Sequence, residues 1–482
     1  MAIEDLIKSR LEKLKEARRK GIEPYPYSYN RKAKAAELHR KFDSLKAGEE
    51  TEHITSIAGR IMGIRDMGKL VFIDIMDETA KIQVVARSDV CKNFSDLELF
   101  DLGDFAGVEG KIIKTKRNEL SILATEITLL CKSIRPLPEK WHGLKDVELR
   151  YRKRYLDLIM NPEVREVFIK RTQIIDALHE FLKKRGFLEV EIPLLQPVYG
   201  GAAAKPFITH SNALDRDLYL SISPELYLKR LIIGGFEKVY TVCKNFRNES
   251  IDKEHNPEFT MMECYWAYVD YNDIMKLTEE LITHIVKKVH GKFKVKYQGK
   301  EINFKPPWKR MTMKEALKEI AGFEVDKMKD KEILEEIEKH KAYEGPMKRG
   351  YLIAELFELH CEEELIQPTF ITDHPKETTP LCKIHRKDPE LIERFELYIN
   401  GMELANAYSE LNDPIVQRQL FEEQEKETKL EEKHPKDTDF LEALEYGMPP
   451  TGGLGIGIDR LVMLLTDQPT IKDVILFPQM RT

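Results

Sequence analysis

Short alternating patterns of apolar and polar residues run from residue 54 to residue 130. They are clear in "ITSIAGRIMGIRDMGKLVFIDIMDETAKIQVVAR" and again in "FAGVEGKIIKTKRNELSILATEITLL", where turn-forming residues separate the runs. Alternation with period two is typical of half-buried strands. The pattern predicts a small five-stranded β-barrel within residues 51–134.

A helical pattern precedes this region. Residues 8–20 carry seven lysines and arginines against two glutamates, at a spacing that fits one helix with a basic face. A solvated surface helix and a contact with a polyanion both explain such a face. We assign residues 1–50 to this helix and its connector. Residues 135–150 are expected to be a linker, because "RPLPEKWHGL" contains prolines.

Residues 151–482 mix long amphipathic helices with strands, which indicates an α+β domain. The helical pattern that begins near residue 146 ends at Gly186, and "LEVEIPLL" (188–195) reads as a strand interrupted by Pro193. Residues 312–366 are charged and helical. We expect them to form an insertion between strands.

A β-hairpin is predicted around "NFRNESIDKEHNPEFTMMECY" (245–265), with a loop at "DKEHNP". By alternation, Arg247 and Glu249 share one face of the first strand. Phe259, Glu263 and Tyr265 share one face of the second. The hairpin would hold an arginine, an aromatic ring and carboxylates over one patch. A plain surface hairpin with a salt bridge is the alternative.

Three glutamates recur every seven residues in "RFELYINGMELANAYSE": Glu396, Glu403 and Glu410. Because acidic residues are poor strand formers, they either face solvent or ligate Mg²⁺ or hold a cationic substrate. Glu403 has the opposite parity to Glu396. It can reach the same face only through a turn or bulge, and Asn400-Gly401 is a suitable place.

A glycine-rich strand is predicted in "GGLGIGIDR" (452–460), where every second residue from Gly453 is glycine. Such a strand has one bare face on which a flat ligand can lie. A helix would begin around Arg460. The spacing matches neither G-x-G-x-x-G nor a Walker loop, so the sequence supports neither a dinucleotide-binding fold nor a P-loop.

Composition narrows the class of protein. With 482 residues, 42% hydrophobic and 33% charged residues, and a formal charge of −6, the chain resembles an ordinary globular protein of several domains. Its charged N-terminus is unlike a signal peptide, and no apolar run reaches the roughly 20 residues that cross a membrane. The six scattered cysteines argue against zinc and against a disulfide framework. We therefore expect a cytoplasmic protein without a membrane partner.

Together, these motifs resemble those of the class II lysyl-tRNA synthetases over residues 51–482. "EVEIP", "FRNE…HNPEFTMMECYWAY" and "GGLGIGIDR" are similar to the three class II motifs, while "YGGAAAKPF", "SPELYLKR" and "NAYSELND" resemble the lysine-specific elements. The resemblance implies a six-stranded antiparallel catalytic sheet flanked by helices. It also implies an N-terminal OB-fold that binds the anticodon, and a homodimer formed around Pro193.

The resemblance implies a reaction in two steps, in which ATP, L-lysine and tRNA(Lys) give AMP, diphosphate and lysyl-tRNA(Lys), with up to three Mg²⁺ ions. By motif match, the implied catalytic residues are Arg247 and Arg460. The implied ATP site comprises Arg247, Glu249, His255, Phe259, Glu396 and Arg460, and the metal ligands are Glu396 and Glu403. The implied lysine site comprises Gly201, Glu225, Glu263, Tyr265, Asn406, Tyr408 and Glu410. The implied anticodon residues are Phe72, Gln83, Glu126 and Arg65.

Within these groups the family match implies finer roles. Arg247 would contact the α-phosphate and the substrate carboxylate, and Phe259 would stack on adenine. Arg460 would hold the γ-phosphate. The α-amino group of lysine would lie at Gly201 and Glu225, and the ε-ammonium at Glu263, Tyr265 and Glu410. Tyr408 departs from the phenylalanine common in bacterial members, and Lys205 stands where arginine is frequent.

Other interpretations share part of this pattern. Aspartyl- and asparaginyl-tRNA synthetases have the same architecture, but Glu225, Glu263 and Glu410 suit a cationic side chain. A lysyl-transferring paralogue that modifies a translation factor resembles only the catalytic domain, so the barrel argues against it. An inactive scaffold is disfavoured because the residues of all three motifs are present. Phe72 has its own alternative, as a core residue of a small barrel.

Overall fold

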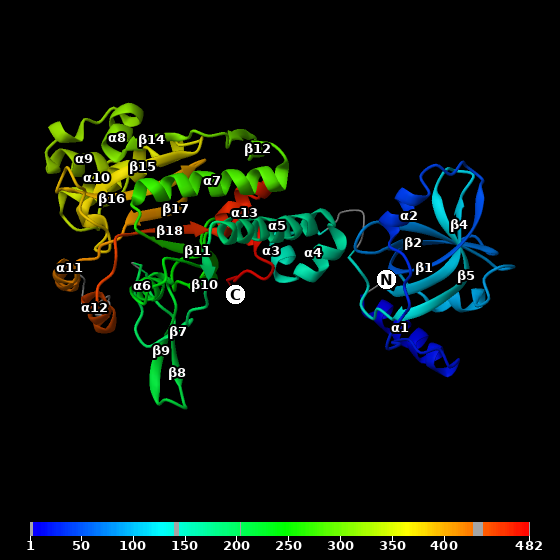
Figure 1. Cartoon of the computed structure of the whole chain (residues 1–482). Helices are drawn as coiled ribbons and strands as arrows, with labels where there is room; N and C mark the ends of the chain where they lie inside the picture. Colours follow the sequence, from blue (N-terminus) through cyan, green and yellow to red (C-terminus); the bar gives the residue numbers. More distant parts are fainter. Residues whose placement is uncertain (1–2, 139–143, 203, 428–436, 482) are drawn as a thin grey trace. The chain divides into compact units, whose positions relative to one another are not determined.

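The computed structural model describes residues 3–138, 144–202, 204–427 and 437–481 of the chain. The chain divides into two compact units, Met1–Gly143 and Leu144–Thr482 (Figure 1). Of the expected linker, residues 139–143 lie outside the described residues.

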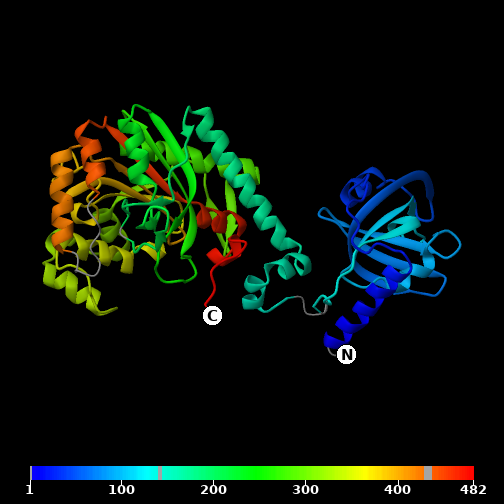
Figure 2. The ribbon, with the colours of Figure 1, turned by 90° about the horizontal axis from the view of Figure 1, so that it is seen from below.

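The first unit is built around a closed barrel with strand order β1-β2-β3-β5-β4, so the expected five-stranded barrel is confirmed (Figure 2). Its strands are β1 (Glu50–Asp66), β2 (Leu70–Met76), β3 (Lys81–Arg87), β4 (Phe105–Lys114) and β5 (Leu120–Cys131). Alternate residues such as Ile73, Ile75 and Val84 fill the interior. Helices α1 (Ile3–Arg19) and α2 (Ala35–Lys41) and the 3₁₀ turn η1 (Phe94–Leu99) complete the unit.

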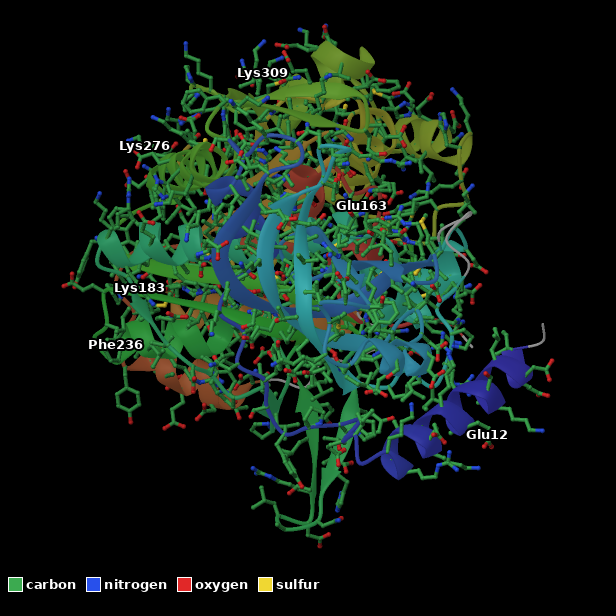
Figure 3. All side chains as sticks on the ribbon, turned by 90° about the vertical axis from the view of Figure 1, so that its right-hand side faces the viewer. Glu12, Glu163, Lys183, Phe236, Lys276 and Lys309 are labelled. Atoms are coloured by element: carbon green, nitrogen blue, oxygen red, sulfur yellow. The ribbon has the colours of Figure 1, made fainter. Side chains whose placement is uncertain are left out.

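Helix α1 uses part of its basic face within its own unit. Arg10 is buried and donates to the carbonyls of Ser133 (2.9 Å) and Leu102 (2.8 Å). Lys13 pairs with Asp101 at 2.8 Å. Glu12, labelled in Figure 3, lies on the exposed side of the helix. The basic face predicted for residues 8–20 is therefore partly consumed by packing against the barrel.

The second unit contains an eight-stranded sheet in the order β14-β15-β16-β17-β18-β11-β10-β6. The six strands from β15 to β10 pair antiparallel, as the family resemblance implies, and a short parallel strand extends each edge. The strands are β6 (Leu188–Glu189), β10 (Lys238–Phe246), β11 (Glu258–Ala267), β14 (Lys309–Thr312), β15 (Thr369–Pro375), β16 (Leu391–Ile399), β17 (Met402–Ser409) and β18 (Thr451–Gly457).

Helices cover one face of this sheet, and the other face carries the candidate site (Figure 1). The covering helices are α5 (Glu163–Lys184), α7 (Tyr271–His290) and α13 (Ile458–Thr466), preceded by α3 (Val147–Arg152) and α4 (Arg154–Met160) and followed by α14 (Ile471–Val474). Strand β11 shows the division: Met262 and Cys264 belong to the core beneath the helices. Glu263, between them, points to the opposite face.

The remaining elements surround the sheet. Two of them are small sheets, built from β7 (Leu195–Gln196), β8 (Ile208–Ser211) and β9 (Arg216–Leu220), and from β12 (Lys294–Tyr297) and β13 (Lys300–Asn303). Helices α6 (Glu225–Ile233), α11 (Pro414–Glu427) and α12 (Thr438–Glu445) and the turn η4 (Lys376–Thr378) lie nearer the candidate site. Residues 312–366 contain α8 (Met313–Ala321), α9 (Asp330–Glu338) and α10 (Arg349–His360), with short turns η2 (Val325–Lys327) and η3 (Glu362–Glu364).

The strand predicted for residues 188–195 is largely wrong. Only its ends pair, as β6 beside β10 and β7 beside β9, and the residues between them are not in strand. Pro193 has no N–H to donate to a ladder. An isolated apolar run needs a partner strand, and this segment has one only at its ends.

Candidate functional site

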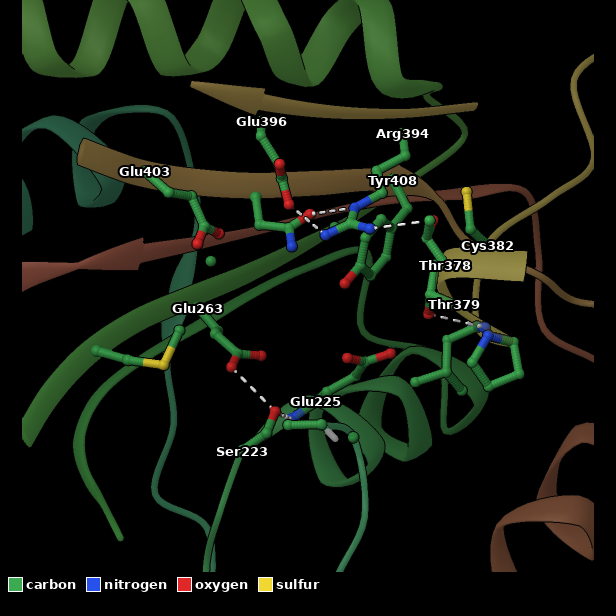
Figure 4. Close-up of a pocket in the computed structure, with 18 of the residues that line it drawn as sticks. Ser223, Glu225, Glu263, Thr378, Thr379, Cys382, Arg394, Glu396, Glu403 and Tyr408 are labelled. Carbon is green, nitrogen blue, oxygen red and sulfur yellow. Dashed lines mark hydrogen bonds and ion pairs between the residues drawn. The ribbon is translucent and has the colours of Figure 1, made fainter. Parts of the chain in front are cut away.

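One cavity of about 1240 Å³ opens on the face of the sheet opposite the covering helices. Its walls come from β11, β16, β17 and β18, from α6, and from the loop after β10. All fourteen residues expected from the second unit line it: Gly201, Glu225, Arg247, Glu249, His255, Phe259, Glu263, Tyr265, Glu396, Glu403, Asn406, Tyr408, Glu410 and Arg460. Figure 4 shows Glu225 and Glu263 on one side, across from Glu396 and Glu403.

Strand β18 supplies the smooth floor expected of alternate glycines. It lies between β11 and β17, and it pairs Gly455 with Glu263 on one side and Asn406 on the other. A β-carbon on Gly453 would collide with the Glu410 carboxylate and the Tyr265 ring. The bare backbone therefore makes room for charged and aromatic groups from both neighbouring strands.

Glu263 is a buried carboxyl group at one end of the cavity. The hydroxyls of Ser223 and Tyr265 donate to its two oxygens at 3.0 and 3.1 Å. Burial, reinforced by the carboxylate of Glu225, raises the pKa of Glu263 to about 8. A cation beside this group would lower its pKa again. The expected face of β11, with Phe259, Glu263 and Tyr265 toward the cavity, is confirmed.

An internal ammonium group lies between two of the other expected carboxylates. Lys229 Nζ is 2.5 Å from Glu225 and 2.5 Å from Glu410, and all three residues are buried. Desolvation disfavours the charge of Lys229, but the two carboxylates outweigh it and raise the pKa of the lysine. Burial raises the pKa of Glu410 to about 8, although Lys229 acts in the opposite direction. Glu410 thus has a cationic partner within the chain.

Arg247 and Phe259 lie together at the other end of the cavity. The guanidinium carbon of Arg247 is 5.1 Å from the centre of the Phe259 ring. Its Nε is buried and has no hydrogen-bond partner among the described residues. An unsatisfied buried donor of this kind suits an incoming oxygen anion.

The expectation that Arg247 and Glu249 share a strand face is wrong. Strand β10 ends at Phe246, and both residues belong to the following loop. The amide of Arg247 still donates to Pro257 at 2.9 Å, but that of Glu249 turns back to Arg247 at 3.0 Å. The ladder therefore stops one residue after the strand, and the loop rather than the pleat directs both side chains.

Arg460, in the first turn of α13, connects two parts of this end. It donates to the carbonyl of Glu403 at 2.7 Å and lies 3.0 Å from His255 Nε2. Because arginine can only donate, Nε2 accepts and the Nδ1–H group of His255 donates to Asp252 at 2.8 Å. The chain Asp252–His255–Arg460 fixes an arginine beside the cavity.

Glu396 and Glu403 reach the same face because of the hairpin between β16 and β17. Asn400 and Gly401 both have positive φ, 53° and 74°, as a two-residue hairpin turn requires. The register then shifts between Leu397 and Tyr398, which leaves one additional residue in β17. The structure thus contains both the turn and the bulge that the opposite parity of Glu403 demands.

These two carboxylates have opposite electrostatic environments. Burial disfavours ionisation of Glu396, but its ion pair with Arg394 outweighs this and lowers its pKa. The Tyr398 hydroxyl also donates to Glu396 at 2.6 Å. Burial and the charge of Glu396 raise the pKa of Glu403. Two carboxylates on one face supply the oxygen donors that a hard divalent cation such as Mg²⁺ prefers.

Three residues that contact the carboxylates of the cavity escaped the sequence analysis: Ser223 and Arg394, which line the cavity, and Lys229, which is buried against Glu225 and Glu410. Two of them had a readable signal. Lys229 lies four residues after Glu225 in "SPELYLKR", the spacing of an ion pair on a helix. Arg394 lies two residues before Glu396 and so shares its strand face. Ser223 offered no signal, because a serine before a helix usually caps it.

The expected anticodon residues lie on the barrel. Arg65 and Phe72 face each other across β1 and β2, with the guanidinium 5.7 Å from the ring centre. Gln83, on the next strand, accepts from Ser121 at 3.1 Å. Phe72 is half-buried on the outer surface rather than in the main barrel core. Glu126 lies apart from these three, further along β5, near Lys92 (3.8 Å).

Comparisons with known proteins agree with this arrangement. The family described as "tRNA synthetases class II (D, K and N)" matches residues 146–481, and the family "OB-fold nucleic acid binding domain" matches residues 55–130. The chain is 53% identical to "Lysine--tRNA ligase" of Thermotoga maritima, over 99% of this chain and 96% of that protein. It is 52% identical to "Lysine--tRNA ligase" of Carboxydothermus hydrogenoformans, over 99% and 98% of the two chains.

The similarity to lysine–tRNA ligases extends to a clostridial protein. "Lysine--tRNA ligase" of Clostridium novyi is 51% identical over 99% of this chain and 94% of that protein. None of the helices in the described residues combines the length and the apolar character needed to cross a bilayer.

Proposed function

Because this chain belongs to the class II tRNA synthetases of the D, K and N group, we propose that it is a lysine–tRNA ligase whose cavity binds L-lysine at one end and ATP at the other. The observation that carries this proposal is the distribution of charge. Three buried carboxylates gather at one end. At the other lie Arg460 and Arg247, whose buried Nε has no hydrogen-bond partner among the described residues.

The lysine end suits a substrate with two ammonium groups. Burying a cation without a partner is costly, so a site for lysine needs carboxylates in place before binding. Glu225, next to Gly201, would receive the α-amino group. Glu263 and Glu410, with Tyr265 between them, would receive the ε-ammonium, and Asn406 and Tyr408 would line the path.

The other end suits the triphosphate. A carboxylate is already a nucleophile, so adenylation needs positioning and charge neutralisation rather than a general base. Arg247 would hold the substrate carboxylate and the α-phosphate together, which brings the attacking oxygen in line with the departing pyrophosphate. Phe259 would stack on adenine, with Glu249 and His255 beside the nucleotide, and Arg460 would bind the terminal phosphate.

Members of this family use Mg²⁺, and we propose Glu396 and Glu403 as its protein ligands, with up to three ions accompanying ATP. When bound, Mg²⁺ would offset the negative charge of the phosphates. Arg394 holds Glu396 through an ion pair, and the β17 bulge holds Glu403 on the same face. These two contacts fix the separation of the ligands in advance of binding.

In the second step, the 3′-hydroxyl of tRNA(Lys) would attack the lysyl carbonyl and release AMP. Discrimination of the tRNA would come from the barrel, where Phe72 would stack on an anticodon base and Gln83 would read a base edge. Arg65 lies over Phe72 and would support it. Glu126 is the weakest member of this set, because it lies apart from the other three.

We further propose a cytoplasmic homodimer joined around Pro193. Apolar side chains of the segment around Pro193 are exposed: Leu188 (47%), Leu194 (36%) and Leu195 (50%). An exposed apolar edge beside a sheet is typical of a subunit interface. Light scattering at micromolar concentration tests this point, and a fully active monomer would contradict it.

ATP–pyrophosphate exchange with each amino acid in turn tests the proposed activity. We expect exchange with L-lysine and far less with aspartate or asparagine, because the cavity offers carboxylates to the side chain. Exchange stimulated by aspartate or asparagine would instead indicate an aspartyl- or asparaginyl-tRNA synthetase. A complete lack of exchange with every amino acid would support an inactive scaffold. Transfer of lysine to a translation factor but not to tRNA would favour the paralogue.

A further inference from the structure

A second group of ligand side chains lies in the helical insertion, outside the cavity described above. Glu336 is in the last turn of α9, His340 follows two residues after the helix ends, and His360 is the last residue of α10. One ligand atom from each lies within 4.8 Å of the other two. Among the described residues, no other three histidine, cysteine or carboxylate side chains bring their ligand atoms so close together.

The two histidines face the same carboxylate oxygen. Nε2 of His340 is 3.8 Å from Glu336 Oε1, and Nε2 of His360 is 3.9 Å from it. These distances are too long for hydrogen bonds. The ligands of a tetrahedral Zn²⁺ ion, at about 2.0–2.1 Å from the metal, lie roughly 3.3 Å from one another. Each of the two nitrogen–oxygen distances would therefore have to shorten by about half an ångström to seat such an ion.

The surroundings leave these atoms available. Nε2 of His360 is buried and has no hydrogen-bond partner among the described residues. The other oxygen of Glu336, Oε2, accepts from Lys339 at 2.5 Å. Oε1 is the oxygen that faces the two histidines. The two imidazole rings are perpendicular, with centres 4.8 Å apart, and Phe323 packs edge-on against His360 at 5.1 Å. The ring of His360 is thus held in place by packing.

We propose that Glu336, His340 and His360 form a binding site for a divalent transition metal of the Zn²⁺ class. Imidazole nitrogen with carboxylate oxygen is a donor set that Zn²⁺ accepts in tetrahedral sites, with the fourth position left to water. His340 is about half exposed, which gives the ion a route of entry. The scattered cysteines argue only against sites built on thiolates, and this site uses none.

The position of the site gives it a structural consequence. The metal would join the end of α9 to the end of α10, two helices already packed through Ile333, Ile337 and Leu356. Residues 339–348 connect these helices, and Glu344, Gly345, Pro346 and Lys348 line the cavity. The ion would anchor the chain at the start of this segment, and so would restrain one wall of the cavity from outside it.

Metal titration of the chelator-stripped full chain tests the proposal. Zn²⁺ is titrated in competition with a chromogenic chelator, in excess Mg²⁺ to occupy the carboxylates of the cavity. The variants are H340Q and H360Q. The matched control is H210Q, because His210 is as exposed as His340 and also lies near two carboxylates, but without a second histidine.

We expect the wild type and H210Q to bind one Zn²⁺ that both insertion variants bind more weakly. Loss of a direct ligand should cost more than the roughly 10–100-fold that loss of an outer partner costs. With Co²⁺ as probe, the intense visible absorption of a tetrahedral site should appear in the wild type and H210Q only. Melting without metal should be alike in all four proteins, which checks the fold. Equal Zn²⁺ binding and equal Co²⁺ spectra in all four would overturn the proposal, whatever the activity of the enzyme.

Discussion

The two ends of the cavity hold charge in different ways. At the lysine end, Glu225, Glu263 and Glu410 are buried, and Glu225 and Glu410 share the internal ammonium of Lys229. At the phosphate end, Arg247 is half-buried, His255 is exposed, and the side chains come from a loop and from a helix terminus. The carboxylates of one end are part of the protein interior, whereas Arg247 and His255 of the other are more accessible to solvent.

This difference indicates which end sets the specificity for the amino acid and which end binds the nucleotide. A buried carboxylate cannot be compensated by water, so it discriminates strongly between a cation and a neutral group. Charges along a rim interact more weakly one by one, but several of them can converge on a large polyanion that brings its own metal. We therefore expect the buried carboxylates to determine amino-acid specificity. Nucleotide binding should depend on several charges that converge on the phosphates.

The largest effect is expected from E410Q, which keeps the shape of the side chain but removes its charge. Loss of one partner of a buried ion pair costs about 3–5 kcal/mol. At 1.36 kcal/mol for each factor of ten, kcat/KM for lysine should fall by roughly 10² to 10³ or more. The KM for ATP should barely change. Pyrophosphate exchange with lysine and ATP varied separately measures both.

The control for E410Q is E445Q, which breaks the exposed pair of Glu445 with Arg418 (2.6 Å). Exposed pairs contribute under about 1 kcal/mol, so this variant should change neither constant by more than about threefold. If E410Q behaves like E445Q, or loses only ATP binding, Glu410 does not belong to the lysine site.

E396Q should produce the reverse pattern. Removing one carboxylate weakens metal binding, and charge stabilisation by a metal contributes several kcal/mol in phosphoryl chemistry, so a loss of roughly 10²-fold is expected in kcat/KM for ATP. Higher Mg²⁺ should restore part of it, while lysine still binds. The measurement is exchange at several Mg²⁺ concentrations. If the loss does not respond to Mg²⁺ and lysine binding is lost instead, Glu396 does not act at a separate metal and ATP end.

F72A should reduce charging of tRNA(Lys) while sparing adenylate formation. Loss of one base stack costs about 1–3 kcal/mol, or roughly 5- to 150-fold. F105A is the matched control, since Phe105 is also a barrel aromatic covered by an arginine, Arg60, at 4.2 Å. Aminoacylation and exchange are measured side by side. Equal losses in both reactions for F72A would mean that the ring only supports the fold.

The smallest effect is the pH dependence of lysine binding. The pKa of Glu263 is raised to about 8 by burial and by Glu225, so the free site holds a proton there at pH 7. A bound ammonium favours the carboxylate, so binding releases that proton. Lysine affinity should therefore rise with pH, by at most about tenfold per unit, and level off above about pH 8.

Calorimetry in buffers of different ionisation enthalpy counts the released protons. E263Q should lower that number and weaken the dependence on pH, leaving the part due to Glu410, whose pKa burial also raises to about 8. A rising KM for lysine between pH 6.5 and 8 in the wild type would have the wrong sign for this account.

Sequence reasoning succeeded where the backbone itself determines the answer. The alternation along β11 places Phe259, Glu263 and Tyr265 because strands have period two. Asn400-Gly401 identified a turn because few other residues accept positive φ at two successive positions. Both inferences need only local geometry.

Sequence reasoning failed where the structure of a segment depends on residues far away in the sequence. The end of β10 depends on where its partner strand leaves, and this placed Arg247 and Glu249 in a loop. The apolar run around Pro193 lacks a partner strand over most of its length. The contact of Lys229 with Glu410 joins α6 to the residue after β17, and no local pattern connects those two segments.

The most direct test of the central claim compares lysine with 6-hydroxynorleucine, its neutral isostere, on the wild type and on E410Q. Because Lys229 loses its partner equally with either ligand, the cycle isolates the contact between Glu410 and the ε-ammonium. The wild type should prefer lysine by roughly 10²- to 10³-fold in kcat/KM for pyrophosphate exchange, and E410Q should reduce this preference below about tenfold. An equal preference in both proteins would contradict the account.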